Sequence, residues 1–278
     1  MRWIRLSIAV VAVSIAACMS GRGPAVTQAK TGPASAMTAA YASADPGVID
    51  RDATPRDPVA LLEEALVRCD RDVRDYECVF ERRERIGGRL YPAQRMRVRY
   101  NDHPRTVHMV WLDNIDQVRQ AWYAEGENLS AAGDEQVIIE PAGRLLRAVA
   151  GRIAIDAHGD LARRSSRFTI DQFGFRSTLE RILDGIHRFE AGGVMRIDYA
   201  GTGRIGGRAT HVIVRRLPYD GPDGPYPEAK LIVHLDRQTL MPVAVYCYAD
   251  PGEQVLLASY VTTQVTTNTG WRSTSDGI

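Results

Sequence analysis

The sequence predicts an α+β fold in which an antiparallel sheet packs one apolar face against amphipathic helices. Three observations predict it. Several segments alternate apolar and polar residues as strands do, two segments repeat apolar residues at helical spacing, and turn residues separate these segments. The elements come in the order helix, strands, helices, strands, which differs from the strict βα alternation of a parallel sheet.

The first expected helix spans about residues 58–71. Asp57 followed by Pro58 is a typical helix start, because Asp caps the first turn and Pro suits its first position. A second, short helix is expected at 142–149. A third is expected at 173–189, where Phe175, Leu179, Ile182, Leu183 and Ile186 form one apolar stripe.

The expected strands fall in two groups, one on each side of the later helices. The first group follows the helix at 58–71, and the second follows the helix at 173–189. Alternating runs place the strands at about 76–80, 94–100, 106–111 and 117–125, then 194–203, 209–217, 229–236, 242–249 and 254–263. Such runs separated by turns are typical of an antiparallel sheet.

The pentapeptide RIGGR occurs twice, at 85–89 and 204–208. The second copy lies in Gly-x-Gly-x-x-Gly, but a strand pattern follows it instead of the helix that a dinucleotide-binding loop needs. Both copies are therefore interpreted as hairpin turns. In the first, a three-residue loop of Ile86-Gly87-Gly88 would place Phe80 opposite Gln94 and give the sheet one apolar face.

The N-terminus resembles a bacterial lipoprotein signal. Arg2 and Arg5 precede the apolar run Leu6 to Ala17, and Ile15-Ala-Ala-Cys18 is similar to a lipobox. The resemblance implies that residues 1–18 are a signal peptide and that Cys18 is acylated, which would anchor the protein to a membrane. Met19, in place of Asp, favours the outer membrane, on its periplasmic face. The alternative is ordinary secretion.

Residues 19–56 are predicted to be a flexible tether, because they are rich in Ala, Gly, Ser, Thr and Pro and contain few large apolar residues. A single α+β domain is expected at 57–278. The formal net charge of +1 gives no field that would attract nucleic acid, so no nucleic-acid partner is expected. Arginines between Arg83 and Arg99 are interpreted as a solvated outer face, or alternatively as contacts to anionic lipid.

Three cysteines follow Cys18, and an oxidising envelope would allow one disulfide. Cys69–Cys78 is the favoured pair, Cys78–Cys247 is its rival, and three free buried thiols are the third possibility. No sequence motif for a nucleophile, a phosphate loop or a metal site is found. Asp156-Ala-His158-Gly-Asp160 could offer metal ligands but is interpreted as a polar turn. We therefore expect no metal, no cofactor and no enzymatic activity.

Two resemblances to known families add to these expectations. Tyr76-Glu-Cys78-Val-Phe80, the following Glu84-Arg-Ile-Gly-Gly-Arg-Leu90, Gln94-Arg-Met96 and His108-Met-Val-Trp111 resemble an uncharacterised family of bacterial envelope proteins over about residues 58–265. More loosely, the segment from Lys230 to Val243, with Asp236, Thr239 and Pro242, is similar to a hairpin of LolA/LolB-type lipoprotein carriers. That resemblance implies a strongly curved antiparallel sheet, an unclosed β-barrel wrapped around a few helices.

Together these observations predict a non-enzymatic, membrane-anchored envelope module for a lipid or another hydrophobic ligand. The alternatives are a structural or protein-interaction domain with a solid interior and, less favoured, a hydrolase. Ten apolar residues from the sheet and the long helix are predicted to line the ligand site: Tyr76, Phe80, Met96, Val98, Met109, Trp111, Phe175, Leu179, Leu183 and Val245.

Overall fold

The computed structural model describes residues 47–51, 54–115, 117–190 and 192–272, which all belong to one compact unit, Ser43–Ile278. The predicted signal peptide, Cys18 and the predicted tether up to residue 46 lie outside the described residues. Among the described residues, no helix combines the length and the apolar character needed to cross a membrane.

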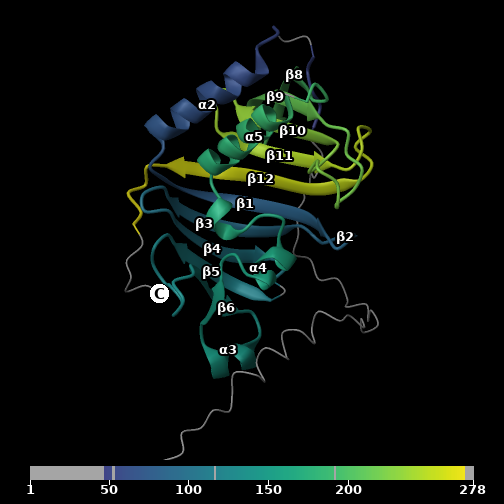
Figure 1. Ribbon diagram of the computed structural model, residues 1–278. Coiled ribbons are helices and arrows are strands. Elements are labelled where there is room, and N and C mark those ends of the chain that lie inside the picture. The colour runs from purple at the N-terminus through teal and green to yellow at the C-terminus, as the bar shows by residue number, and fades with distance from the viewer. Residues whose placement is uncertain (1–46, 52–53, 116, 191, 273–278) are drawn as a thin grey trace, which may run out of the picture. The chain divides into compact units, whose positions relative to one another are not determined.

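The core of the fold is an antiparallel, curved and open sheet of twelve strands (Figure 1). Its strand order is β7-β6-β5-β4-β3-β1-β12-β11-β10-β9-β8, and the short β2 pairs with β1. The strands are β1 (Asp75–Ile86), β2 (Arg89–Leu90), β3 (Gln94–Asn101), β4 (Thr106–Asp113), β5 (Val118–Ala124), β6 (Gln136–Pro141), β7 (Ile153–Asp156), β8 (Arg196–Ile205), β9 (Arg208–Arg216), β10 (Lys230–Asp236), β11 (Pro242–Tyr248) and β12 (Leu256–Thr267).

Two meanders make up this sheet. One runs from β1 through β3 to β7 and the other from β8 to β12, so neighbouring strands within each are close in sequence. The two meet where β1 pairs with β12, with Phe80 opposite Thr262 and Glu84 opposite Ala258. Because directly opposed residues of an antiparallel pair point to the same side, this register aligns the side chains of the two meanders on common faces.

The helices are α2 (Pro58–Asp72), α3 (Arg144–Ala150), α4 (Asp160–Ser165) and α5 (Phe175–Glu190), with a 3₁₀ turn at Ile170–Gln172. As predicted, Asp57 caps α2: its Oδ1 accepts hydrogen bonds from the backbone N–H groups of Val59 and Ala60 at 2.9 and 3.1 Å. Helices α2, α5 and α4 lie over the same side of the sheet, and α2 packs against α5 (Figure 1). We call this side the inner face.

The inner face and α5 enclose an aromatic core. The Tyr76 ring stacks on Phe175 of α5 with centroids 4.4 Å apart and on Tyr100 of β3 at 4.8 Å. Tyr76 is 1% exposed. The predicted apolar stripe of α5 is confirmed, since Phe175, Leu179, Ile182, Leu183 and Ile186 are all buried.

Both RIGGR segments are hairpin turns, as predicted, but the three-residue loop is wrong. Ile86 pairs with Arg89, which leaves the two-residue turn Gly87-Gly88, and both glycines have positive φ, at 55° and 81°. Residues 91–93 then shift the register, so Phe80 lies opposite Met96 instead of Gln94. The apolar face survives, because this displacement of two residues preserves the side to which each side chain points.

The hairpin of β10 and β11 is organised by a single carboxylate. Asp236 Oδ1 accepts hydrogen bonds from the backbone N–H groups of Gln238 and Thr239, both at 3.0 Å, and from Thr239 Oγ1 at 3.1 Å. Its other oxygen accepts a bond from Arg208 Nε at 2.5 Å. The Asp-x-x-Thr part of the motif therefore has a local structural role in closing the turn.

The predicted Cys69–Cys78 disulfide is absent: Cys69, Cys78 and Cys247 are free and buried. Cys69 lies in the last turns of α2, in the electrostatic field of Asp70, Asp102 and Arg176. Cys78 lies within β1, opposite Val98 of β3. Cys69 thus packs in the helix layer and Cys78 in the sheet, which the nine-residue sequence spacing does not reveal.

Contact with the sheet begins before the predicted domain start at residue 57. The backbone of Asp50 exchanges two hydrogen bonds with Thr202 of β8, at 2.7 and 2.8 Å. Gly201 permits this approach, because a Cβ atom there would collide with the Asp50 carbonyl oxygen. The segment 47–51 therefore belongs to the fold, which corrects the predicted tether boundary.

Candidate ligand-binding face

The seven predicted site residues that come from the sheet all point to the inner face. The register places Tyr76 opposite Tyr100, Phe80 opposite Met96, and Met96 opposite Trp111. Val98 lies opposite Met109. On the other meander, Val245 lies opposite Tyr260, which in turn lies opposite Arg82 of β1. Because the predicted helix residues Phe175, Leu179 and Leu183 are buried on α5, the structure brings the whole set into one layer.

Burial divides this set into two groups. Eight of the ten belong to the buried core: Tyr76, Met96, Val98, Met109, Phe175, Leu179, Leu183 and Val245. Only Phe80 and Trp111 are half-buried and pack against the edge of that core. The sequence pattern groups the seven sheet residues on one face and the three helix residues on one stripe, but it does not separate core residues from those that a ligand could reach.

Three further half-buried aromatic residues extend the accessible part of the inner face. Phe80 meets Phe173 edge-on, with centroids 5.0 Å apart, and stacks parallel to Tyr260 at 6.2 Å. Tyr260 also contacts Phe168, at 5.7 Å. We call Phe80, Trp111, Phe168, Phe173 and Tyr260 the inner aromatic surface. The sequence does not reveal the role of Phe168 and Phe173, because they flank a short 3₁₀ turn, where no periodic pattern marks their orientation.

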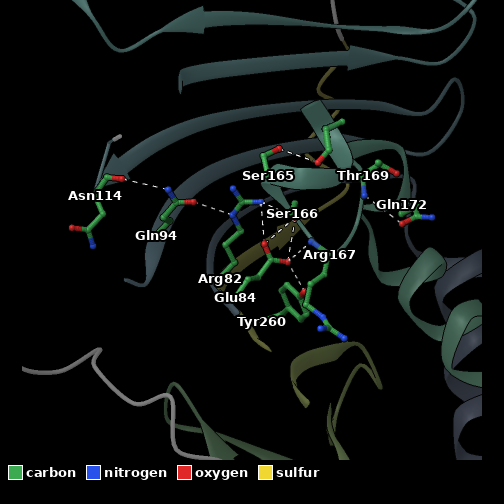
Figure 2. A network of polar contacts seen from close by, with 11 residues as sticks. Arg82, Glu84, Gln94, Asn114, Ser165, Ser166, Arg167, Thr169, Gln172 and Tyr260 are labelled. Atoms are coloured by element: carbon green, nitrogen blue, oxygen red, sulfur yellow. Dashed lines mark hydrogen bonds and ion pairs between the residues drawn. The ribbon is translucent and has the colours of Figure 1, made fainter. Parts of the chain in front are cut away.

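Next to this surface, the buried carboxylate of Glu84 is the centre of a hydrogen-bond network (Figure 2). Its oxygens accept hydrogen bonds from Tyr260 Oη at 2.6 Å, from Ser166 Oγ at 3.0 Å and from the Arg167 backbone N–H at 3.2 Å. Arg82 lies 3.7 Å away as an ion-pair partner. The network attaches the chain after α4 to the junction of β1 and β12.

Arg82 extends this network across the sheet. Its Nε donates to Gln94 Oε1 at 3.0 Å, and Gln94 Nε2 lies 3.5 Å from the Asn114 carbonyl oxygen (Figure 2). Another Arg82 nitrogen donates to Ser166 Oγ at 3.0 Å. Because Arg82, Glu84 and Gln94 share the inner face with Phe80, the polar and aromatic areas are adjacent.

A second ion pair, with both side chains buried, joins β9 to the loop before β10. Arg215, 6% exposed, donates to Glu228 Oε1 at 2.5 Å and to the Ile182 carbonyl oxygen at 3.4 Å. Gly185 of α5 makes room for it, since a Cβ atom there would lie 2.5 Å from an Arg215 nitrogen. Buried charges persist in proteins when they are paired and hydrogen-bonded, as these are.

Two more arginines, Arg167 and Arg181, reach this region. Arg181 stacks over the Phe168 ring at 4.0 Å, and Arg167 donates to the Pro227 carbonyl oxygen at 3.2 Å. Burial raises the pKa of the nearby Cys247 thiol to about 12, and Glu228 adds to the shift while the arginines 167, 215 and 181 oppose it. The cysteine on β11 therefore lies among one carboxylate and three guanidinium groups.

The Asp156–His158 turn and two histidines of the sheet, His211 and His234, make local contacts. Asp156 accepts a hydrogen bond from the His158 backbone N–H at 2.8 Å, as in an ordinary polar turn. His234, on β10, contacts Thr210 Oγ1 through Nδ1 at 3.0 Å, and His211 contacts Tyr199 Oη at 2.9 Å. Within the described ranges, no group of three or more His, Cys, Asp or Glu side chains is arranged to hold a metal ion.

Comparison with known proteins identifies one family. The family "Protein of unknown function (DUF1571)" matches residues 73–275, which confirms the expected resemblance to an uncharacterised family. No curated protein matches the sequence.

Solved structures with similar chains include three at low identity. Lipoprotein LppX of Mycobacterium tuberculosis is 10% identical, with 75% of this chain and 96% of that chain covered and a TM-score of 0.40. A DUF1329 family protein of Desulfovibrio piger is 10% identical, with coverages of 78% and 96% and a TM-score of 0.38. A LolA superfamily protein of Nitrosomonas europaea is 9% identical, with coverages of 78% and 96% and a TM-score of 0.25.

Proposed function

The chain belongs to the DUF1571 family of proteins of unknown function, and we propose that it binds a lipid or another hydrophobic ligand on the inner face of its sheet. The observation that carries the proposal is the inner aromatic surface. Its five rings remain only half-buried, and four of them, all except Phe168, pack against a large apolar core. A ligand chain laid across them would extend that core.

These half-buried rings leave apolar area in contact with water. When a ligand covers apolar surface, binding is favoured by about 25 cal/mol of free energy for each Å² removed from water. Aromatic rings add contact area at a small entropic cost, because they have few rotatable bonds. A flexible acyl chain suits a row of rings in several orientations, such as Phe80, Phe173 and Tyr260.

We propose that the protein is a lipoprotein of the bacterial envelope, held at the periplasmic face of the outer membrane by an acylated Cys18. The lipobox-like Ile15-Ala-Ala-Cys18 supports this, as does the short apolar run before it. The segment from residue 19 towards the first contact of Asp50 with β8 would then serve as the tether.

Substitution of the anchor tests the location. Only a thiol at residue 18 can accept a thioether-linked diacylglycerol, so Cys18→Ser should abolish labelling with radioactive palmitate. Wild-type protein should label and partition into detergent. Unlabelled, soluble wild-type protein with a mature N-terminus other than residue 18 would show plain secretion instead. The melting temperature should be equal in both proteins, since residue 18 precedes the domain.

Extraction tests the binding. Full-length protein with Cys18→Ser, whose own acyl chains cannot compete, should release co-purifying lipid into organic solvent, detected by mass spectrometry. Phe80→Ala combined with Trp111→Ala should reduce that lipid at least several-fold. The matched control is Val110→Ala, which removes a half-buried residue from the same strand on the opposite face, where it lies opposite Arg97. Protein without lipid at any occupancy, and without affinity for added dodecanol, would refute the proposal.

A further inference from the structure

The inner face contains more positive than negative charge around Cys247 and Tyr260. Four arginines, Arg82, Arg167, Arg181 and Arg215, surround two carboxylates, Glu84 and Glu228. Arg82 pairs with Glu84 at 3.7 Å and Arg215 with Glu228 at 2.5 Å. Two guanidinium groups, those of Arg167 and Arg181, are therefore in excess.

Neither excess arginine has a carboxylate within 4.0 Å among the described residues. The buried Nε of Arg167 has no hydrogen-bond partner there, although one of its terminal nitrogens donates to the Pro227 carbonyl oxygen. Arg181 makes one long contact, 3.5 Å to the Gln172 carbonyl oxygen, besides its stacking on Phe168. Most of the donor capacity of these two side chains is left unused.

Guanidinium groups that are shielded from water and lack an anionic partner reduce the stability of the fold. Arg167 and Arg181 are half-buried, and a charge partly shielded from water without a carboxylate partner is unfavourable. Burial accordingly lowers the pKa of Arg181. The neighbouring carboxylates are already engaged, since Glu84 accepts bonds from Tyr260, Ser166 and the Arg167 backbone. An anion from outside the chain would satisfy both guanidinium groups.

The position of these charges relative to the aromatic rings indicates the kind of anion. Arg181 stacks on Phe168, Phe168 contacts Tyr260 at 5.7 Å, and Tyr260 stacks on Phe80 at 6.2 Å. The series therefore leads from a charged group at one end to the half-buried apolar rings at the other. A molecule with one acidic end and one apolar chain matches both ends.

We propose that Arg167 and Arg181 bind the acidic headgroup, a carboxylate or a phosphate, of an amphiphile whose chain lies on the inner aromatic surface. This inference rests on the proposed function and names its ligand class. The guanidinium fork presents parallel N–H donors to two oxygens of such a group, and charge-assisted bonds of this kind are about twice as strong as neutral ones. The ligand's negative charge would also offset the excess positive charge of the inner face.

Calorimetric titration of the full-length Cys18→Ser protein with matched probes tests this. Dodecanoate and dodecyl phosphate should bind at least about tenfold more tightly than dodecanol, which has the same chain without the charge. Inorganic phosphate alone should bind far more weakly than dodecyl phosphate. Arg167→Gln and Arg181→Gln should each lower the affinity for dodecanoate about tenfold or more and leave the affinity for dodecanol unchanged. Arg181→Lys, which keeps the charge, should restore part of the affinity.

Arg163→Gln is the control, because it removes the same charge from an exposed position on α4. It should leave all affinities unchanged. Equal affinity for dodecanoate and dodecanol, or equal loss in the three Gln variants, would overturn the headgroup site while leaving the hydrophobic site intact. If inorganic phosphate bound as tightly as dodecyl phosphate, the headgroup site would be overturned in favour of a site for small anions. Failure of every amphiphile to bind would instead refute the proposed function.

Discussion

The Tyr260 hydroxyl donates a hydrogen bond of 2.6 Å to the Glu84 carboxylate, although 176 residues separate the two in sequence. Tyr260 lies on β12 and Glu84 on β1, the two strands that join the meanders of the sheet. Burial and the neighbouring Glu84 carboxylate raise the pKa of Tyr260 well above its ordinary value, so the hydroxyl remains a donor. The contact thus stabilises the centre of the sheet.

Tyr260→Phe should destabilise the fold by about 1.5–3 kcal/mol, the usual range for a hydrogen bond to a charged group. The phenyl ring keeps the stacking on Phe80, so the loss of stability reports the contribution of the hydroxyl alone. Urea denaturation followed by circular dichroism measures the change. Tyr91→Phe, at an exposed position, is the control and should be neutral. A neutral Tyr260→Phe would mean that Glu84 is satisfied without this bond.

Stability should fall as the pH drops from 7 to 5, partly because of His234. This side chain is 0% exposed, and burial lowers its pKa from 6.5 to about 4. Between these values the unfolded chain binds a proton at His234 that the folded chain excludes, so acid favours unfolding. The contribution lost by pH 5 is about 2 kcal/mol.

His234→Gln removes that titration and should flatten the curve of unfolding free energy against pH over the same range. The exposed His187→Gln should leave the slope unchanged. The measurement is denaturant unfolding at intervals of pH. His234→Gln protein with a wild-type slope would show that His234 binds its proton equally well in the folded and unfolded chains, so that burial does not lower its pKa.

Gly201→Ala should destabilise the protein by about 1–3 kcal/mol, since φ at this position is +118°, a region that side chains other than glycine avoid. The added Cβ would also collide with the Asp50 carbonyl oxygen and displace the 47–51 segment from β8. Thermal unfolding measures the first effect and proteolysis near Asp50 the second. Gly192→Ala, whose nearest contact is an ordinary 3.6 Å, should have a much smaller effect. Equal melting temperatures for the two variants would contradict this assignment.

Alkylation should detect three protected thiols. Cys69, Cys78 and Cys247 are buried and free, and burial raises the pKa of each. In Cys18→Ser protein, iodoacetamide at pH 8 should modify none of them in the folded state. All three should react after unfolding without reductant, giving a mass increase of three adducts. A single adduct under those conditions would reveal a disulfide.

Local signals in the sequence predict much of this fold. Asp57-Pro58 marks the start of α2, and the stripe from Phe175 to Ile186 marks the buried side of α5. Alternation places Phe80, Met96 and Trp111 on one face even though the predicted register is displaced by two residues. These features depend on neighbours within a few residues, where periodicity and turn chemistry are decisive.

The rest depends on contacts that no local pattern encodes. Alternation from Phe80 places Glu84 on the inner face. Its hydrogen-bond partners Tyr260, Ser166 and Arg167, however, come from segments distant in sequence. Arg167 and Arg181 are inconspicuous among the many arginines of the chain. Their functional interest comes from a shortage of nearby carboxylates, which only the packed arrangement reveals.

The pairing of β1 with β12 has a consequence for synthesis of the chain. On the ribosome, β1 emerges near the start of the domain and its partner close to the end. Until β12 is available, β1 is paired only with β3 on one side, and β11 only with β10. The other edge of each of these two strands is unpaired. Such edges invite pairing with other chains. A protein shortened before Leu256 would lack β12, so both edges would stay exposed and pairing with other chains would be expected to persist.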